Sequence, residues 1–224
     1  MKLKYGVDDI NIHSINLEFA KSFYMWFRTV RNCSHNTSIK YISNLKKIII
    51  ICMDNAWLQH DPWAKFDMTK DEVDPIFLEK HELEAIIAKE ITIERLANVR
   101  DVYIFCCCTG LAFIDVKQLK RSEVKIGIDG ELWIDKERHK TNVPSRIPLL
   151  PLAKFILERH KDNIECLAND TLLPVLSNSK YNAYLKELAD ICGVKKNLTT
   201  HTARHTFGTT VTYYMAFLWK PLKK

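Results

Sequence analysis

The sequence predicts a mainly α-helical fold with a small β-hairpin or sheet, an α+β class divided between two domains. Over most of the chain, apolar residues recur at spacings of three and four, which is typical of amphipathic helices. Residues 131–135 and 143–148 instead have the composition of strands, and the polar stretch KERHKTN between them predicts a hairpin turn. The charged stretch 67–76 contains a proline and has the composition of an exposed linker.

Residues 1–66 predict a small helical domain with basic outer faces. Helices are expected over 14–30 and 38–53, where the apolar side chains fall on one face. Asp61 followed by Pro62 predicts the start of a short third helix, because proline suits the first helical position.

Residues 77–212 predict a second domain, also mainly helical, and 213–224 form a tail of different composition. Gly110 and Gly193 are expected to end helices, since glycine adopts the left-handed conformation at low cost. The helices of this domain are expected over 77–97, 99–108, 113–121, 151–162, 178–192 and from about Thr200 onward.

The formal net charge is +6, and it is unevenly distributed. Residues 1–66 carry nine Lys and Arg against five Asp and Glu, 67–109 carry five against ten, and 110–224 carry nineteen against twelve. The order basic, acidic, basic suits a polyanion contacted by both basic parts. On charge alone, a solvated surface with excess lysine explains the distribution equally well.

The seven cysteines include three in succession, 106–108, and no CxxC pair. We therefore expect small buried apolar side chains in a reducing compartment, without disulfides or a zinc knuckle. The N-terminus lacks an apolar signal core, and the apolar run 48–52 is far shorter than the ~20 residues that span a bilayer. A cytoplasmic protein without membrane association is expected.

The segment TTHTARHTF, residues 199–207, has the strongest chemical pattern. Thr199 or Thr200 can cap a helix on which His201 and Arg204 share one face. An imidazole and a guanidinium at a helix start could bind a phosphate and donate a proton. A capped helix with a surface salt bridge explains the spacing at least as well. His201 and His205 also have the spacing of a metal pair, but no third ligand lies nearby in the sequence, so no metal is expected.

Lys140 lies in the predicted hairpin turn. A lysine at such a tip is normally only solvated, but its ammonium group could also reach a phosphate and protonate a leaving oxygen.

Together, these segments resemble the tyrosine recombinase (phage integrase) family, most closely the integrases of bacterial conjugative and other mobile elements. NTSIKYISNLKKI (36–48) is similar to the family's N-terminal core-binding domain. The ordered set is specific, whereas each piece alone is weak. The catalytic-domain pieces are CTGLAFIDVKQL (108–119), HKTNVPSRIPL (139–149) and LTTHTARHTFGTTVT (198–212).

The resemblance implies a core-binding domain over 1–66 and a catalytic domain over 77–212 that together hold duplex DNA. It implies DNA integration and recombination through a 3′-phosphotyrosyl link, with no metal or other cofactor. The expected partners are duplex DNA at recombination sites, and a second copy or a full-length integrase. The expected location is the bacterial cytoplasm, on the nucleoid.

The resemblance also assigns roles to individual residues. Lys140 would protonate the leaving 5′-oxygen, His201 would transfer a proton and bind the phosphate, and Arg204 would stabilise charge on the pentavalent phosphorus. Further contacts to DNA are expected from Lys40, Lys46, Lys47, Arg138 and His205.

The chain departs from the family pattern at two places. Ala112 stands where the family usually has its first catalytic arginine, and losing such a ligand typically costs a factor on the order of 10²–10³ in rate. The family's nucleophilic tyrosine is expected well beyond the HxxR motif, whereas Tyr213 and Tyr214 lie too close to Arg204. No nucleophile is identified, so the chain is interpreted as C-terminally truncated and defective alone.

Three hypotheses follow from the sequence. The chain is a recombinase that acts only when a tyrosine comes from another subunit. Alternatively, it is a non-catalytic DNA-binding remnant that recognises or competes for recombination sites. The third hypothesis is a non-functional fragment whose second domain has an open core.

Overall fold

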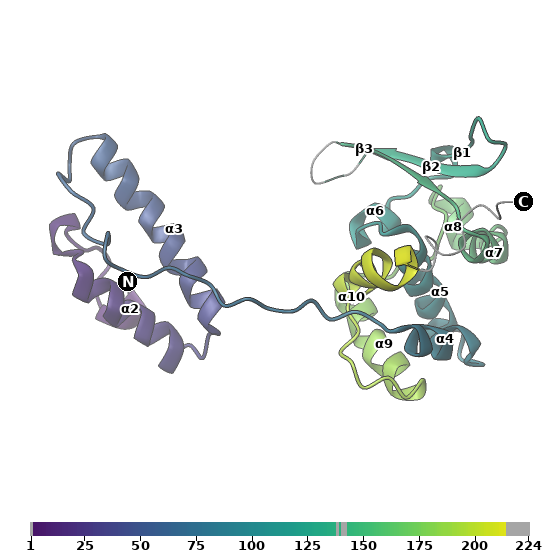
Figure 1. Ribbon diagram of the computed structural model, residues 1–224, viewed down its shortest axis with the longest axis horizontal. Coiled ribbons are helices and arrows are strands. Elements are labelled where there is room, and N and C mark those ends of the chain that lie inside the picture. Colours follow the sequence, from purple (N-terminus) through teal and green to yellow (C-terminus); the bar gives the residue numbers. More distant parts are fainter. Residues whose placement is uncertain (1, 138, 140–142, 214–224) are drawn as a thin grey trace, which may run out of the picture. The chain divides into compact units, whose positions relative to one another are not determined.

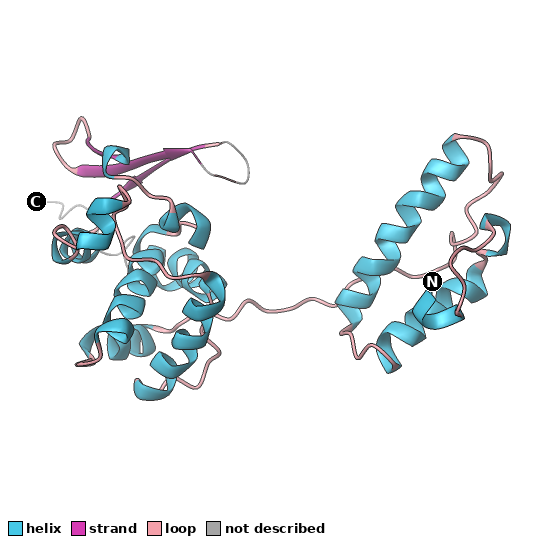
Figure 2. Ribbon diagram, turned by 180° about the vertical axis from the view of Figure 1, so that it is seen from behind, coloured by secondary structure: helices cyan, strands magenta, loops and turns pink. Residues whose placement is uncertain are grey.

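The computed structural model describes residues 2–137, 139 and 143–213. The chain forms two compact units, Met1–Asp74 and Pro75–Lys224 (Figure 1). Helices dominate the described residues, which contain one small antiparallel sheet (Figure 2). The predicted fold class is therefore confirmed. None of the described helices is both long and apolar enough to cross a membrane.

The N-terminal unit is built on two long helices joined by a short loop. Side chains cap both helices: the side-chain amide oxygen of Asn16 accepts the Phe19 N–H at 2.9 Å, and the Ser34 hydroxyl accepts the Thr37 N–H at 3.3 Å. The elements are α1 (Lys2–Tyr5), a 3₁₀ turn (Ile12–Ser14), α2 (Leu17–Thr29) and α3 (His35–Asp54).

The core of this unit includes Trp63, which is fully buried among side chains of α2 and α3. Its indole N–H donates to the backbone carbonyl oxygen of Asn16 at 3.0 Å. The prediction of a third helix from Asp61 was wrong. The Asp61 carboxylate does accept the Trp63 N–H at 2.9 Å, but the chain makes only turns there, because the buried ring holds it against the core.

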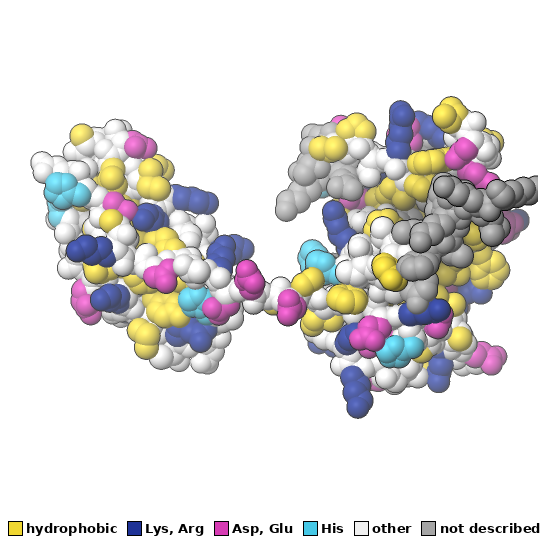
Figure 3. Space-filling model, viewed as in Figure 1, with side chains coloured by type: hydrophobic (Ala, Val, Ile, Leu, Met, Phe, Trp, Pro, Cys, Tyr) yellow, Lys and Arg dark blue, Asp and Glu magenta, His cyan; other side chains and the backbone are white. Residues whose placement is uncertain are grey.

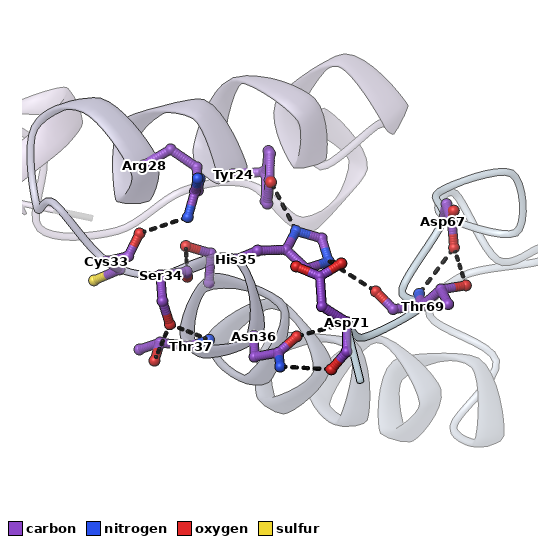
Figure 4. Close-up of polar contacts among 11 residues, drawn as sticks. Tyr24, Arg28, Cys33, Ser34, His35, Asn36, Thr37, Asp67, Thr69 and Asp71 are labelled. Carbon is purple, nitrogen blue, oxygen red and sulfur yellow. Dashed lines mark hydrogen bonds and ion pairs between the residues drawn. The ribbon is translucent and has the colours of Figure 1, made fainter. Parts of the chain in front are cut away.

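The segment that follows this core is fastened to the first turn of α3 (Figure 4). The Asn36 amide makes two hydrogen bonds to the Asp71 backbone, at 2.9 and 2.8 Å. The His35 ring lies 2.9 Å from both the Thr69 carbonyl oxygen and the Tyr24 hydroxyl. A carbonyl oxygen can only accept, so Nε2 of His35 carries a proton. The chain through Asp71 is therefore bound to α3.

The C-terminal unit surrounds one helix with shorter elements. The antiparallel sheet has the order β1–β2–β3, and Ile134 of β2 pairs with Val124 on one side and Ile147 on the other. The elements are α4 (Lys80–Ala88), α5 (Glu94–Thr109), α6 (Phe113–Lys117), a 3₁₀ turn (Arg121–Glu123), β1 (Val124–Ile126), β2 (Leu132–Glu137), β3 (Pro144–Pro148), α7 (Pro151–Arg159), α8 (Ile164–Ala168), α9 (Asn178–Ile191), α10 (Thr200–Thr206) and a π-helical turn (Phe207–Val211).

Helix α5 is the central helix of this unit. Its residues from Val99 to Thr109 are all buried, and α7, α9 and α10 pack against it. The predicted burial of Cys106, Cys107 and Cys108 is confirmed, since each is at most 5% exposed. Burial and the neighbouring Cys108 raise the pKa of Cys106 to about 12, so this thiol stays protonated at neutral pH.

The predicted helix over 77–97 is interrupted. Helix α4 ends at Ala88, residues 89–93 are not helical, and α5 begins at Glu94. The Arg100 guanidinium donates to the Lys89 carbonyl oxygen at 2.7 Å, which satisfies a backbone group at the end of α4. Strand β1 and helix α8 were not predicted, because three and five residues are too few for a periodic pattern.

Asp101 joins α5 to α7 through a buried polar network. Its carboxylate is 2% exposed and accepts hydrogen bonds from the side chains of Arg100, Arg159 and His160 at 3.0 to 3.3 Å. Burial alone would raise the pKa of Asp101. The hydrogen bond from His160 and the charges of Arg159 and Arg100 outweigh burial, so this pKa lies below its ordinary value.

Gly110 ends α5 in the left-handed conformation, with φ of 64°, as predicted. A Cβ at this position would lie 2.4 Å from the Phe207 ring, so both the backbone and the close approach require glycine.

We expect Asp101→Asn to lower the free energy of unfolding of the C-terminal unit by about 3 kcal/mol, because it leaves the buried guanidinium of Arg100 without its anion. Since the folded-state pKa of Asp101 is lowered, its ionised form stabilises the fold above the unfolded pKa of about 3.9. That stabilisation is lost as the pH falls through the folded-state value. Urea unfolding between pH 7 and pH 3 measures both effects. An equal acid sensitivity in Asp101→Asn and wild type would contradict this account.

We expect Gly110→Ala to destabilise the same unit by about 2 kcal/mol or more, through left-handed backbone strain and the clash with Phe207. Thermal unfolding measures the loss, and Gly193→Ala is a matched control. Gly193 is also left-handed, with φ of 69°, but nothing lies within 4 Å of the added Cβ. Gly193→Ala should therefore cost less, and equal losses would exclude the role of Phe207.

Candidate phosphate and nucleic-acid site

Helix α10 begins at a reciprocal cap. The Thr199 hydroxyl accepts the Thr202 N–H at 3.2 Å, and the Thr202 hydroxyl accepts the Thr199 N–H at 3.0 Å. This arrangement satisfies two backbone donors at the helix start. It fixes the turn on which His201 lies and leaves the His201 side chain free of any capping role.

His201, Arg204 and His205 are all exposed on α10. Among the described residues, none of these three side chains has a hydrogen-bond or ion-pair partner. The salt bridge of the alternative explanation is therefore not found in the described part of the chain. Arg204 and His201, three residues apart, both face outward and can bind an external anion together.

The opposite face of α10 is buried. Thr202, Ala203 and Thr206 are at most 3% exposed, and the helix packs on α5. The Phe207 ring then lies against Gly110 at the end of α5. The fold thus brings the segments 108–119 and 198–212 together at one place.

The hairpin is attached to the same region. The His139 N–H donates to the Asp115 carboxylate at 2.9 Å, and Asp115 is 3% exposed within α6, two residues after the start of that helix. In Figure 1, α6 lies between the sheet and α10. Lys140 and Arg138 lie outside the described residues, but their neighbour His139 is anchored beside the helix that follows Gly110.

Asp115 was not singled out from the sequence. An acidic residue in the first turn of a helix normally interacts favourably with the helix dipole. Because this role explains Asp115 from the local sequence, its long-range hydrogen bond was not predicted. Another buried contact of the hairpin was also missed: the Lys136 ammonium, 7% exposed, bonds both Glu123 carboxylate oxygens at 2.9 Å. Lys136 therefore holds β2 to the preceding turn.

The predicted DNA contacts of the N-terminal unit differ in their availability. Lys40 and Lys47 are exposed, and a spacing of seven places them on the same face of α3. Lys46 instead forms an ion pair with Asp61, with a nitrogen–oxygen distance of 2.8 Å. On the face shown in Figure 3, Lys and Arg side chains are interspersed with Asp and Glu and do not form one continuous patch.

The described residues contain no group of three or more His, Cys, Asp or Glu side chains arranged to hold a metal ion. Ala112 is the N-cap residue of α6 and supplies no charge. Tyr213 lies nine residues after Arg204 on the continuing helix, which corresponds to roughly 13 Å along the axis. Tyr214 lies outside the described residues.

We expect Asp115→Ala to release the hairpin turn at His139, because a hydrogen bond to a charged acceptor contributes about 1.5–3 kcal/mol. Amide hydrogen exchange at His139 should accelerate about tenfold or more. Asp129→Ala is the matched control, since Asp129 accepts the Glu131 N–H and the Trp133 indole N–H at the other turn of the sheet. Unchanged exchange at His139 in Asp115→Ala would contradict the anchoring role.

The family model for the phage integrase SAM-like domain matches residues 2–70. No curated protein sequence matches the chain. Solved structures with the same fold are a lambda integrase dimer bound to a COC′ core site and a Tn1549 transposon integrase in complex with a circular intermediate DNA. The third is a XerH site-specific recombinase bound to a palindromic difH substrate.

The similarity to these structures lies in the fold rather than the sequence. The lambda integrase is 18% identical with a TM-score of 0.71, over 95% of this chain and 76% of that one. The Tn1549 integrase is 14% identical with a TM-score of 0.70, over 92% and 75%. XerH is 17% identical with a TM-score of 0.68, over 92% of this chain but only 64% of its own. The chain therefore has the fold of the tyrosine recombinases, and its residues 2–70 match the model of the phage integrase SAM-like domain.

Proposed function

We propose that the chain is a site-specific DNA recombinase, an integrase of a mobile genetic element, that binds duplex DNA. One observation carries this proposal. An exposed imidazole and an exposed guanidinium, His201 and Arg204, have no partner among the described residues, on a helix that packs beside Gly110. The similar structures support the proposal, because their descriptions name DNA at a core site, a difH site and a circular intermediate.

The proposed chemistry is a transesterification at one backbone phosphate. A tyrosine hydroxyl attacks phosphorus, the 5′-oxygen leaves, and the link to the tyrosine retains the energy of the broken bond for rejoining. Arg204 donates two parallel hydrogen bonds to the phosphate oxygens, and His201 transfers a proton beside it. Lys140 protonates the leaving oxygen. These steps require no cofactor.

Each unit carries its own proposed contacts to DNA. In the N-terminal unit, as the core-binding domain, Lys40 and Lys47 contact backbone phosphates, and Lys46 contributes if its ion pair with Asp61 opens. In the C-terminal unit, as the catalytic domain, Arg138 and His205 add contacts beside the phosphate site. The proposed partners on DNA are a second copy of the chain and a full-length integrase, of which the full-length integrase can supply the attacking tyrosine. The proposed location is the bacterial cytoplasm, on the nucleoid.

A second candidate function is a non-catalytic module that recognises or competes for recombination sites. Ala112 favours this candidate, because it stands where the family usually has its first catalytic arginine and supplies no guanidinium to the phosphate site. The distance between Tyr213 and Arg204 along the helix also favours it. The two candidates share DNA binding and differ only in strand cleavage.

We expect Arg204→Ala to weaken duplex binding about tenfold and to reduce the salt dependence by about one counterion, because one phosphate contact is lost. Fluorescence anisotropy with a duplex selected from a random library, at several salt concentrations, measures both. Arg95→Ala is the matched control, since the exposed Arg95 is already paired with Glu187 at 2.8 Å. Wild-type binding that does not depend on salt, or equal effects of the two variants, would exclude the proposed site.

A nicked suicide substrate distinguishes the two candidates. Recombinase function predicts a covalent protein–DNA adduct, alone or after mixing with a full-length relative, and loss of the adduct in His201→Ala. DNA binding without an adduct under either condition would favour the non-catalytic module.

A further inference from the structure

The chain that enters the C-terminal unit is tied directly to the helix of the candidate site. Leu78 is fully buried, and its N–H donates to the Thr206 hydroxyl oxygen at 2.9 Å. Its carbonyl oxygen accepts the hydroxyl of Thr210. The backbone N–H and the carbonyl oxygen of Leu78 are therefore both bonded to threonine side chains, and these threonines follow His201 and Arg204 in the chain.

These threonines are held firmly in place. The Thr206 hydroxyl donates its hydrogen to the Thr202 carbonyl oxygen at 2.8 Å, so it can only accept from Leu78. Thr206 is 0% exposed and lies two residues after Arg204. The π-helical turn begins at the next residue, and such turns are frequent at functional sites. A displacement of Leu78 must therefore move this turn or break buried hydrogen bonds.

The linker is also fixed at its other end. The bonds from Asn36 hold the Asp71 backbone, and the bond from His35 holds Thr69, within the N-terminal unit. Only residues 72–77 lie between the two attachments. Seven Cα–Cα steps separate Asp71 from Leu78, which span at most about 25 Å when fully extended. The two attachments therefore cannot move further apart than this length without a force on Leu78.

We propose that Thr206 and Thr210 are positioning residues that couple the interdomain linker to the orientation of His201 and Arg204. Binding of the N-terminal unit to DNA fixes one end of the linker. The linker then holds Leu78, and through it α10, in the orientation that presents both side chains to the phosphate. The inference rests on the proposed function and adds a mechanical requirement to it.

The first test measures how much Arg204 contributes to DNA binding, as the ratio of Kd in Arg204→Ala to Kd in its parent protein. We expect about tenfold in the wild-type parent. When Thr206→Val/Thr210→Val is the parent protein, the ratio should fall below about threefold. It should fall to the same value when the parent protein has four Gly and Ser residues inserted after Val73. Combining both changes should lower the ratio no further, because either one interrupts the same connection.

Matched variants distinguish loss of the hydrogen bonds to Leu78 from a general disturbance of α10 and the turn that follows it. Thr209→Val removes a hydroxyl from the same turn. Among the described residues this hydroxyl bonds the His205 carbonyl oxygen and not Leu78, so the variant should keep the tenfold ratio. Thr206→Ser retains the hydroxyl and should also keep it. An unchanged ratio in Thr206→Val/Thr210→Val, or a reduced one in Thr209→Val, would overturn the proposal. Thr210→Val alone provides the same comparison if the double variant does not fold.

A second test does not depend on DNA. Thr206→Val/Thr210→Val should shift the NMR signals of the Arg204 Nε–H and the His201 ring in the DNA-free protein, because it removes both bonds to Leu78, whereas Thr209→Val should not. Shifts of equal size in both variants, or in neither, would overturn the positioning role even if DNA binds as proposed. If the wild-type chain fails to bind DNA, the proposed function is excluded, but the NMR comparison still tests the positioning role of the two threonines.

Discussion

The burial of α5 from Val99 to Thr109 is the constraint on which the C-terminal unit depends. A helix that is buried on all sides must be covered on all sides, and α7, α9 and α10 provide that cover. The helix can end only where a residue accepts the left-handed conformation, and Gly110 also leaves room for the Phe207 ring. The position of α10, and with it the outward direction of His201 and Arg204, therefore follows from core packing.

Much of the fold could be predicted because local patterns and core packing agree. One-sided apolar spacing identified α2, α3, α7 and α9, and Gly110 and Gly193 identified two helix ends. The failures occurred where distant residues decide the local structure. Trp63 draws residues 61–66 into the core instead of a helix, and Arg100 satisfies the backbone where α4 stops. Neither influence has a signature in the neighbouring sequence.

The candidate site divides in the same way. The spacing of His201 and Arg204 predicted a shared helix face, because helix geometry is a local property. Whether these side chains are paired depends on residues elsewhere in space, so spacing could not decide it. The contact of Asp115 with His139 spans 24 positions, and that of Thr206 with Leu78 spans 128. Both involve residue types that have an ordinary local role, which is why neither stood out.

The cationic side chains of the C-terminal unit differ in burial and pairing, and this difference separates those that stabilise the fold from the one available to a ligand. Arg100 and Lys136 are buried and paired, as the large cost of burying an unpaired charge requires. Arg95 is exposed but already bonded to Glu187, so it has little capacity for an external anion. Arg204 is exposed on a helix whose opposite face is buried, and it has no partner among the described residues. A guanidinium in this state contributes little to folding, and its full hydrogen-bonding capacity remains available to a phosphate.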